Sequence, residues 1–291
     1  MFSDIPPSLF ALTSALLFAI GAQIQNVGLS HIDSRNGATI SIVSSAVFFW
    51  LMAPFLLDGS NWLRPAVLIF VLVGLFRPSV SANLAIAALR HLGPTMTTTL
   101  SATSPLFGAF FGVLLLGETL TWPIAIGTGG IIGAVAMLAR RDAKATTTWP
   151  LWALGLPIGA AAIRSIGHVF SKIGMASIPD PYFAGLVAFT VSSLVMLVVH
   201  RIRPGAHRVR WRGQGPYWFV AAGVIMGVSV ISLNTALLRG HIVTVVPIVA
   251  CSPVFTMLLS VLVFRRERLT PRTVLAVALV VPSVVFIALN L

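Results

Sequence analysis

Acidic side chains are scarce in this sequence, which has 7 aspartates and glutamates against 19 lysines and arginines among 291 residues. Charged residues make up 9% of the chain, whereas ordinary soluble domains carry about a quarter. A soluble fold of this length could not bury the 57% of residues that are hydrophobic. The cations lie at the ends of apolar runs, which indicates contact with anionic lipid and membrane orientation rather than nucleic acid binding. The composition therefore predicts an integral membrane protein.

Cysteine is nearly absent as well, and this narrows the chemistry. The single Cys251 excludes an intramolecular disulfide and a cysteine-based metal cage. The sequence contains no HExxH, GxSxG or clustered acid motif, so we expect no enzyme activity, no catalytic residue, no cofactor and no bound metal. A filter-like motif of the kind that ion channels use is also lacking.

Apolar runs bounded by glycine, proline and charge clusters predict ten transmembrane helices. Each run is close to the roughly 20 residues that cross a ~30 Å hydrocarbon core. The predicted spans are 8–29, 37–57, 65–89, 95–116, 121–139, 150–171, 182–200, 215–238, 243–264 and 271–290. The expected fold class is an all-α integral membrane protein.

The second half of the chain repeats short motifs of the first half in the same order. Ser44-Ser45 matches Ser192-Ser193, Ala87–Arg90 matches Ala236–Arg239, Ser104-Pro105 matches Ser252-Pro253, and Glu118–Thr121 matches Glu267–Thr270. Residues 1–145 and 146–291 are thus predicted to form two repeats of five spans each. An odd number of spans inverts the second repeat, and inverted repeats are typical of alternating-access carriers with a site near the midplane.

The same residues carry a family resemblance. The stretch ALRHLGPTMTTTLSATSPLFGAFFGVLLLGETLTWPIAIGTGGIIGAVAML resembles the EamA-type repeat of the drug/metabolite transporter (DMT) superfamily, and the segment from Leu233 to Leu289 is similar, with Arg265-Arg266 where Leu-Gly is usual. The resemblance implies a ten-helix transporter in a bilayer, expected to be a bacterial inner membrane, with a small-molecule substrate and a monomeric or homodimeric state. The first span has Phe18-Ala19 instead of the family's frequent Trp-Gly pair, so no binding residue is transferred to it.

The loop charges predict the orientation. Arg64, Lys172 and Arg239 lie on the side of the termini, fourteen other cations lie on the opposite side, and Arg77 and Arg164 complete the 19 from within the membrane. The positive-inside rule then places both termini outside the cytoplasm, whereas EamA-type relatives are usually drawn with cytoplasmic termini.

Arg77 lies in the middle of the third predicted span, about 18 Å from either end at ~1.5 Å per residue. A charge at that depth costs at least ~2.5 kcal/mol, and no span contains a carboxylate that could neutralise it. Arginine can bind a carboxylate or phosphate through two parallel hydrogen bonds. Arg77 is therefore the first candidate for substrate binding.

Further candidates are polar residues at membrane depth. Arg164, His168 and Lys172 share one face of the sixth span. Arg164 faces either the cavity or helix-terminal carbonyls, His168 is either pH-sensitive or a packing residue, and Lys172 is expected to reach an interface.

The remaining substrate-binding candidates carry neutral polar side chains. Ser81 shares a face with Arg77, and Gln23 lies late in the first span. Asn83 and Asn234 hold similar places in the third and eighth spans, where they could bond each other or a ligand.

Together these features predict a carrier that moves a small polar or carboxylate-bearing metabolite, an amino acid or related compound, by alternating access, with export as the expected direction. The missing membrane-depth acid disfavours proton-coupled export of cationic drugs. Drug efflux, a channel and a structural membrane protein are the alternative hypotheses. Energy coupling stays open at this point.

Overall fold

A computed structural model describes residues 5–77, 79–139, 150–202, 213–263 and 271–289. Their secondary structure is helical throughout. In chain order the elements are α1 (Pro7–Gly28), α2 (Ser34–Leu56), η1 (Gly59–Leu63), α3 (Val67–Phe76), α4 (Ser79–Ser101), α5 (Ser104–Leu116), α6 (Trp122–Ala139), η3 (Leu151–Leu154), α7 (Gly155–Ser177), α8 (Pro181–Ile202), α9 (Gly215–Arg239), α10 (Ile242–Val249), α11 (Ser252–Leu262) and α12 (Pro271–Leu289).

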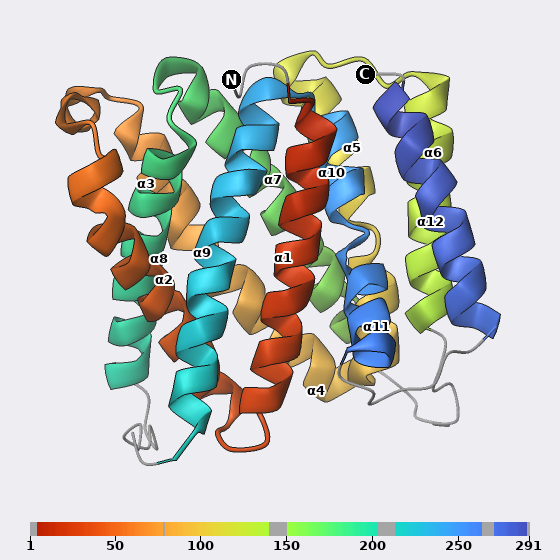
Figure 1. The fold of residues 1–291 in the computed structure, drawn as a ribbon, viewed down its shortest axis with the longest axis horizontal. Coiled ribbons are helices and arrows are strands. Elements are labelled where there is room, and N and C mark those ends of the chain that lie inside the picture. The colour runs from red at the N-terminus through yellow and green to blue at the C-terminus, as the bar shows by residue number, and fades with distance from the viewer. Residues whose placement is uncertain (1–4, 78, 140–149, 203–212, 264–270, 290–291) are drawn as a thin grey trace.

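The helices confirm the predicted class. Among the described residues, seven stretches are long and apolar enough to span a membrane, and three shorter apolar helices, 104–116, 122–138 and 274–289, fall at three further predicted spans. The start of α1 and the end of α12 lie on the same side of the bundle, here called the terminal side (Figure 1). The all-α membrane fold expected from the apolar runs is therefore correct.

The third predicted span differs in detail, because it is broken at Arg77. Arg77 has φ −122° and ψ 129°, so α3 ends at Phe76 in an extended residue and α4 begins at Ser79. The next residue in the sequence is Pro78, and a proline pushes the residue before it out of the α region. Hydropathy alone does not detect this break, since the residues on both sides of it are apolar.

A further helix break occurs at equivalent places in both halves, before a Ser-Pro pair. Thr103 precedes Ser104-Pro105 with φ −74° and ψ −5°, and Cys251 precedes Ser252-Pro253 with φ −77° and ψ −2°. The proline stands in the first turn of α5 and of α11, where its missing N–H costs no helical hydrogen bond. The matched backbone follows directly from the matched sequence.

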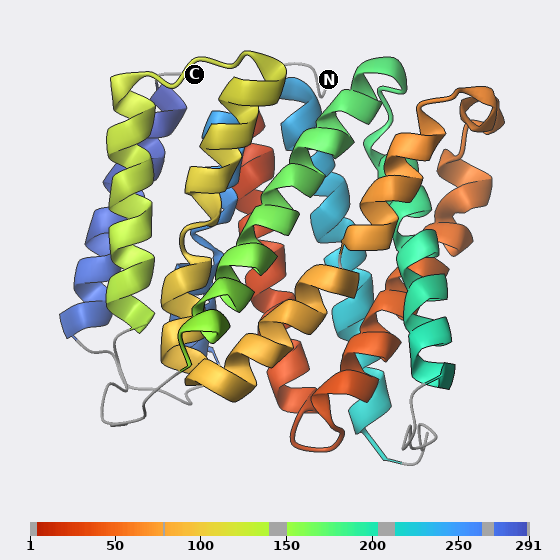
Figure 2. The same cartoon turned by 180° about the vertical axis from the view of Figure 1, so that it is seen from behind.

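The two halves are inverted relative to each other. In Figures 1 and 2, α1 runs away from the terminal side whereas α7, the first long helix of the second half, runs towards it. The packing follows the same symmetry: α1 packs on α9 as α7 packs on α4, and α2 packs on α9 as α8 packs on α3. The pairs α2 with α8 and α6 with α12 relate equivalent helices across the axis.

Two equivalent helix crossings show how the halves are joined. A Cβ atom on Gly223 of α9 would lie 2.4 Å from a backbone oxygen of α2, and one on Gly74 of α3 would lie 2.7 Å from a backbone oxygen of α8. Only glycine permits these contacts. Each is closed by a serine hydroxyl that donates to the glycine carbonyl, Ser45 to Gly223 and Ser192 to Gly74, both at 2.6 Å. Small residues and short interhelical hydrogen bonds of this kind hold membrane helices together.

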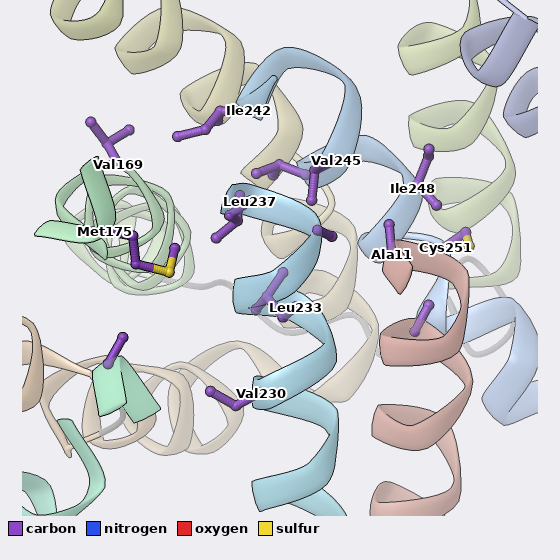
Figure 3. Close-up of a cluster of buried hydrophobic side chains, with 14 of the residues drawn as sticks. Ala11, Val169, Met175, Val230, Leu233, Leu237, Ile242, Val245, Ile248 and Cys251 are labelled. Atoms are coloured by element: carbon purple, nitrogen blue, oxygen red, sulfur yellow. The ribbon is translucent and has the colours of Figure 1, made fainter. Parts of the chain in front are cut away.

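A continuous apolar core fills the space among α1, α7, α9 and α10. Figure 3 shows Met175 of α7, Leu233 and Leu237 of α9 and Ile242 of α10 in this cluster, and each is at most 1% exposed. Cys251 is also buried there, at the break between α10 and α11. The core therefore holds α1, α7, α9 and α10 together.

Candidate functional site

A cavity of about 400 Å³ lies between the two halves. Helices α1, α2, α3, α4, α7, α8 and α9 contribute to its wall, and ligand pockets for small molecules span roughly 300–1,000 Å³. Its polar lining residues are Gln25, Ser41, Ser45, Arg77, Ser171 and Asn234. Most of the other lining side chains are apolar, and none of the described ones is a carboxylate.

The cavity follows the pseudo-two-fold axis. Many of its lining residues form pairs separated by 146 to 149 residues: Gln25 with Ser171, Ala38 with Gly185, Ser41 with Ala188, Ile42 with Phe189, Arg77 with Met226, and Ala85 with Asn234. The same register relates two contacts of glycine with phenylalanine, because Phe219 packs on Gly28 as Phe70 packs on Gly174. A site on this axis is where inverted-repeat carriers bind their substrates.

Arg77 is held at the cavity by contacts along its length. Its backbone N–H donates to Val73 O at 2.8 Å, and its own carbonyl oxygen lies 2.6 Å from the Ser192 hydroxyl, whose single hydrogen it shares with Gly74 O. The guanidinium donates from Nη1 to Nδ1 of His168 at 2.9 Å. The break before Pro78 thus places an arginine with a fixed backbone at the middle of the bundle.

Symmetry makes Arg77 unusual among the lining residues. Its equivalent in the second half is Met226, which also lines the cavity. Gly167 faces the Arg77 side chain as Gly21 faces Met226. The two equivalent positions therefore carry a cation, Arg77, and an apolar side chain, Met226. The described cavity lining is thus charged on one side of the pseudo-two-fold axis.

The polar side chains that line the cavity with Arg77 donate hydrogen bonds to other protein atoms. The Ser41 hydroxyl donates to Phe219 O at 3.0 Å and the Ser45 hydroxyl to Gly223 O at 2.6 Å. The amide Nδ2 of Asn234 donates to Pro181 O at 3.1 Å. These side chains have acceptor oxygens left for a ligand.

Gln25 completes this set. Its Nε2 donates to the Ser41 oxygen at 3.4 Å, which leaves its own carbonyl oxygen as an acceptor. It shares a face of α1 with two other lining residues, Phe18 and Leu29, seven residues earlier and four later. The cavity therefore combines one donor pole at Arg77 with acceptor oxygens on the surrounding helices.

Several sequence-predicted residues lie elsewhere. Gln23 is buried, and its Nε2 donates to Thr256 O of α11 at 2.7 Å. Asn83 donates to Ser79 O within its own helix at 2.9 Å, and Ala85 holds the position equivalent to Asn234. Ser81 is buried on α4 without lining the cavity. These three side chains therefore lie on helix faces that do not line the cavity.

The two other charged candidates lie behind the cavity wall. His168 is 8% exposed and reaches the site only through Arg77. Arg164 lies about one turn away on α7, does not line the cavity, and has a buried Nε without a hydrogen-bond partner. Arg77 is therefore the described cation that faces the cavity.

A second polar cluster lies at the terminal side, where Glu118 joins the two halves. Glu118 belongs to the turn between α5 and α6, yet its side chain is only 4% exposed. It accepts from Lys172 Nζ at 2.8 Å and from the backbone N–H groups of Ile242 and Val243 at 2.9 Å each. Lys172 also donates to Gly240 O at 2.6 Å. Glu118 thus caps the N-terminus of α10 and neutralises the lysine.

This geometry controls the charge of Glu118. Burial alone would raise the pKa of Glu118, but the hydrogen bonds from Lys172, Ile242 and Val243 outweigh it and hold the pKa below its ordinary value of 4.5. Lys172, expected from the sequence to reach an interface, instead ends inside this cluster. The cause is the turn after α5, which brings a carboxylate to it.

Comparisons with known proteins agree with this architecture. A solved crystal structure of a protein superposes with a TM-score of 0.82 at 18% identity, covering 98% of this chain and 96% of that one, which shows a shared fold. No curated protein sequence matches the chain. The model of the EamA-like transporter family matches twice, at residues 6–140 and 150–289. The chain therefore belongs to the EamA-like transporter family of the DMT superfamily and is a membrane transporter rather than an enzyme.

Proposed function

We propose that the protein carries a small molecule with a carboxylate, a hydrogen-bond-donating ammonium and an apolar body, an amino acid or close relative, by alternating access through the central cavity. The observation that carries this proposal is Arg77, the single cation of the described lining of the cavity between the two halves. Its guanidinium has N–H donors beyond the one given to His168, and these suit a carboxylate.

The acceptor oxygens support the second part of the substrate. The Ser41 and Ser45 hydroxyls and one amide N–H each of Gln25 and Asn234 donate to protein atoms, and each of these four side chains has an acceptor oxygen that suits an ammonium group. The apolar lining supports the third part, because Met226, Val230 and several phenylalanines suit a hydrophobic side chain. A permanently cationic drug fits less well, because Arg77 would repel it.

The difference in packing between the terminal side and the opposite side of the cavity supports an alternating-access mechanism. At the terminal side Phe183 packs edge-on against Phe70 and Trp62, with centroids 6.1 and 4.9 Å apart. The position equivalent to Phe183 at the opposite end is Asn36. There Leu29 lines the cavity and is 46% exposed. These contacts support our proposal that this conformation is closed at the terminal side.

The orientation of the loops gives the proposed direction. Because the predicted spans assign fourteen cations to the loops opposite the termini and three to the side of the termini, we place the opposite side in the cytoplasm. The cavity then reaches towards the cytoplasm in this state, and we propose export, in which substrate loads there and leaves at the terminal side.

A reporter fused after Leu291 tests this orientation. An enzyme that is active only in the periplasm is expected to be active in this fusion, and a reporter that is active only in the cytoplasm should be silent. The fusion partners act as each other's control. Strong cytoplasmic activity would contradict the orientation and reverse the proposed direction.

A matched set of ligands tests the substrate class. Leucine, leucinamide and 4-methylpentanoate share an apolar body, but the second lacks the carboxylate and the third lacks the ammonium. We expect leucine to raise the Tm of the purified protein most and to drive saturable counterflow in proteoliposomes. Equal responses to leucine and leucinamide would contradict carboxylate recognition, and transport without saturation would contradict a carrier.

A further inference from the structure

The bond between Arg77 and His168 has a direction that follows from the chemistry of arginine. A guanidinium has only donors, so Nδ1 of His168 must accept from Nη1 across the 2.9 Å distance, and the imidazole proton must be on Nε2. A protonated imidazole would offer no acceptor. It would also add a third positive charge beside Arg77 and Arg164, the two cations whose fields act on His168. The bond therefore requires a neutral imidazole in one tautomer.

Gly167, the residue before His168, packs against the aliphatic part of the Arg77 side chain. A Cβ atom on Gly167 would lie 2.7 Å from Arg77 Cδ, closer than real Cβ atoms approach. At the equivalent crossing, a Cβ atom on Gly21 would lie 3.5 Å from Met226 Cγ, an ordinary contact. One turn of α7 thus makes room for the aliphatic part of Arg77 and accepts a bond from its head group.

We propose that Gly167 and His168 are positioning residues, which hold the Arg77 side chain in the conformer that presents its remaining N–H groups to the substrate carboxylate. His168 does not line the cavity, so it acts through Arg77 rather than on the substrate. This inference rests on the proposed function of Arg77. Its physical basis is preorganisation: an arginine that is already ordered loses less side-chain entropy when it binds a ligand.

Replacements of His168 test the acceptor. His168→Leu keeps bulk but removes the acceptor, so we expect the Kd for leucine to rise roughly tenfold. His168→Asn puts an amide oxygen close to the place of Nδ1 and is expected to restore most of the affinity. In an Arg77→Met background, His168→Leu should have no further effect, because the group that it positions is gone.

The glycine pair gives an independent test with a matched control. Gly167→Ala adds one methyl group, deletes no polar group, and should weaken leucine binding by displacing Arg77. Gly21→Ala makes the same change at the equivalent crossing and should leave binding unchanged. Nitrogen NMR of histidine-labelled protein should show Nδ1 of His168 without a proton, with the signal identified by its loss in His168→Asn.

The outcomes separate the two proposals. If Arg77→Met leaves the Kd for leucine unchanged, the proposed function fails. If Arg77→Met weakens binding but His168→Leu and Gly167→Ala do not, the positioning role is wrong while the proposed function stands. Equal losses in Gly167→Ala and Gly21→Ala, or a proton on Nδ1, would also overturn the positioning role.

Discussion

Arg77→Met is expected to weaken substrate binding roughly ten- to a hundredfold and to reduce transport accordingly, while the protein stays folded. The cavity would lose the one cation of its described lining, and a charge-assisted hydrogen bond contributes about 1.5–3 kcal/mol, or roughly ten- to a hundredfold in affinity. Folding should survive, because the second half already accommodates methionine at the equivalent position, Met226. Membrane insertion should become easier, since a buried arginine costs at least ~2.5 kcal/mol. Counterflow of leucine in proteoliposomes measures the loss.

Two further variants show whether charge or geometry matters at this position. Arg77→Lys keeps the charge but loses the fork of parallel donors, so we expect about tenfold weaker binding. Arg164→Met removes a cation that lies behind the cavity wall, and we expect nearly unchanged affinity. Normal transport by Arg77→Met, or an equal loss in Arg164→Met, would contradict the role of Arg77.

The second large effect is a loss of stability, which we expect when either member of the Glu118–Lys172 ion pair at the terminal side is replaced. Breaking a buried ion pair by removing one partner costs about 3–5 kcal/mol, because the other charge stays buried. Glu118→Gln also weakens the cap of α10, so both Glu118→Gln and Lys172→Met should lower the Tm by roughly 5 °C or more. The double variant should recover part of the loss, since no uncompensated charge remains.

Acidity provides a second way to break this pair. Because the pKa of Glu118 is held below 4.5, its contribution is complete above pH 4.5 and is lost as the pH falls through the lowered pKa. The difference in Tm between the native protein and Glu118→Gln should therefore shrink below pH 4.5. Asp58→Asn, at an exposed carboxylate on the same side, is the control and should change the Tm little. A Tm difference that persists in acid would contradict the ion pair.

The fold was predictable because the sequence patterns that specify it extend over many residues. Apolar runs of nearly twenty residues and motifs repeated about 148 residues apart specify the class, the inversion and the common side of the termini. The matched breaks at Thr103 and Cys251 follow from Ser-Pro pairs that are visible in the sequence. The predicted spans nevertheless ran without interruption through all three breaks, although the proline near each one carries the necessary information.

The site was less predictable, because whether a polar residue lines the cavity depends on the direction in which its side chain points around the helix axis. Gln23 and Gln25 lie at similar depths, but about 200° of helical rotation separates them, and only Gln25 lines the cavity. Asn83 bonds its own helix, while the true equivalent of Asn234 is Ala85, which no polarity pattern marks. The burial of Glu118 depends on a turn that carries it to a helix of the other half. The repeat register is the signal in the sequence that pairs Ala85 with Asn234 and Met226 with Arg77.

The most direct measurement is a set of four dissociation constants, those of leucine and leucinamide for the native protein and for Arg77→Met. The two ligands differ at the carboxylate, and the two proteins differ at the guanidinium, so the set isolates the interaction between these groups. If Arg77 binds the carboxylate, the native protein should prefer leucine by at least about tenfold, and Arg77→Met should bind both ligands equally. An undiminished preference for leucine in Arg77→Met would contradict the account.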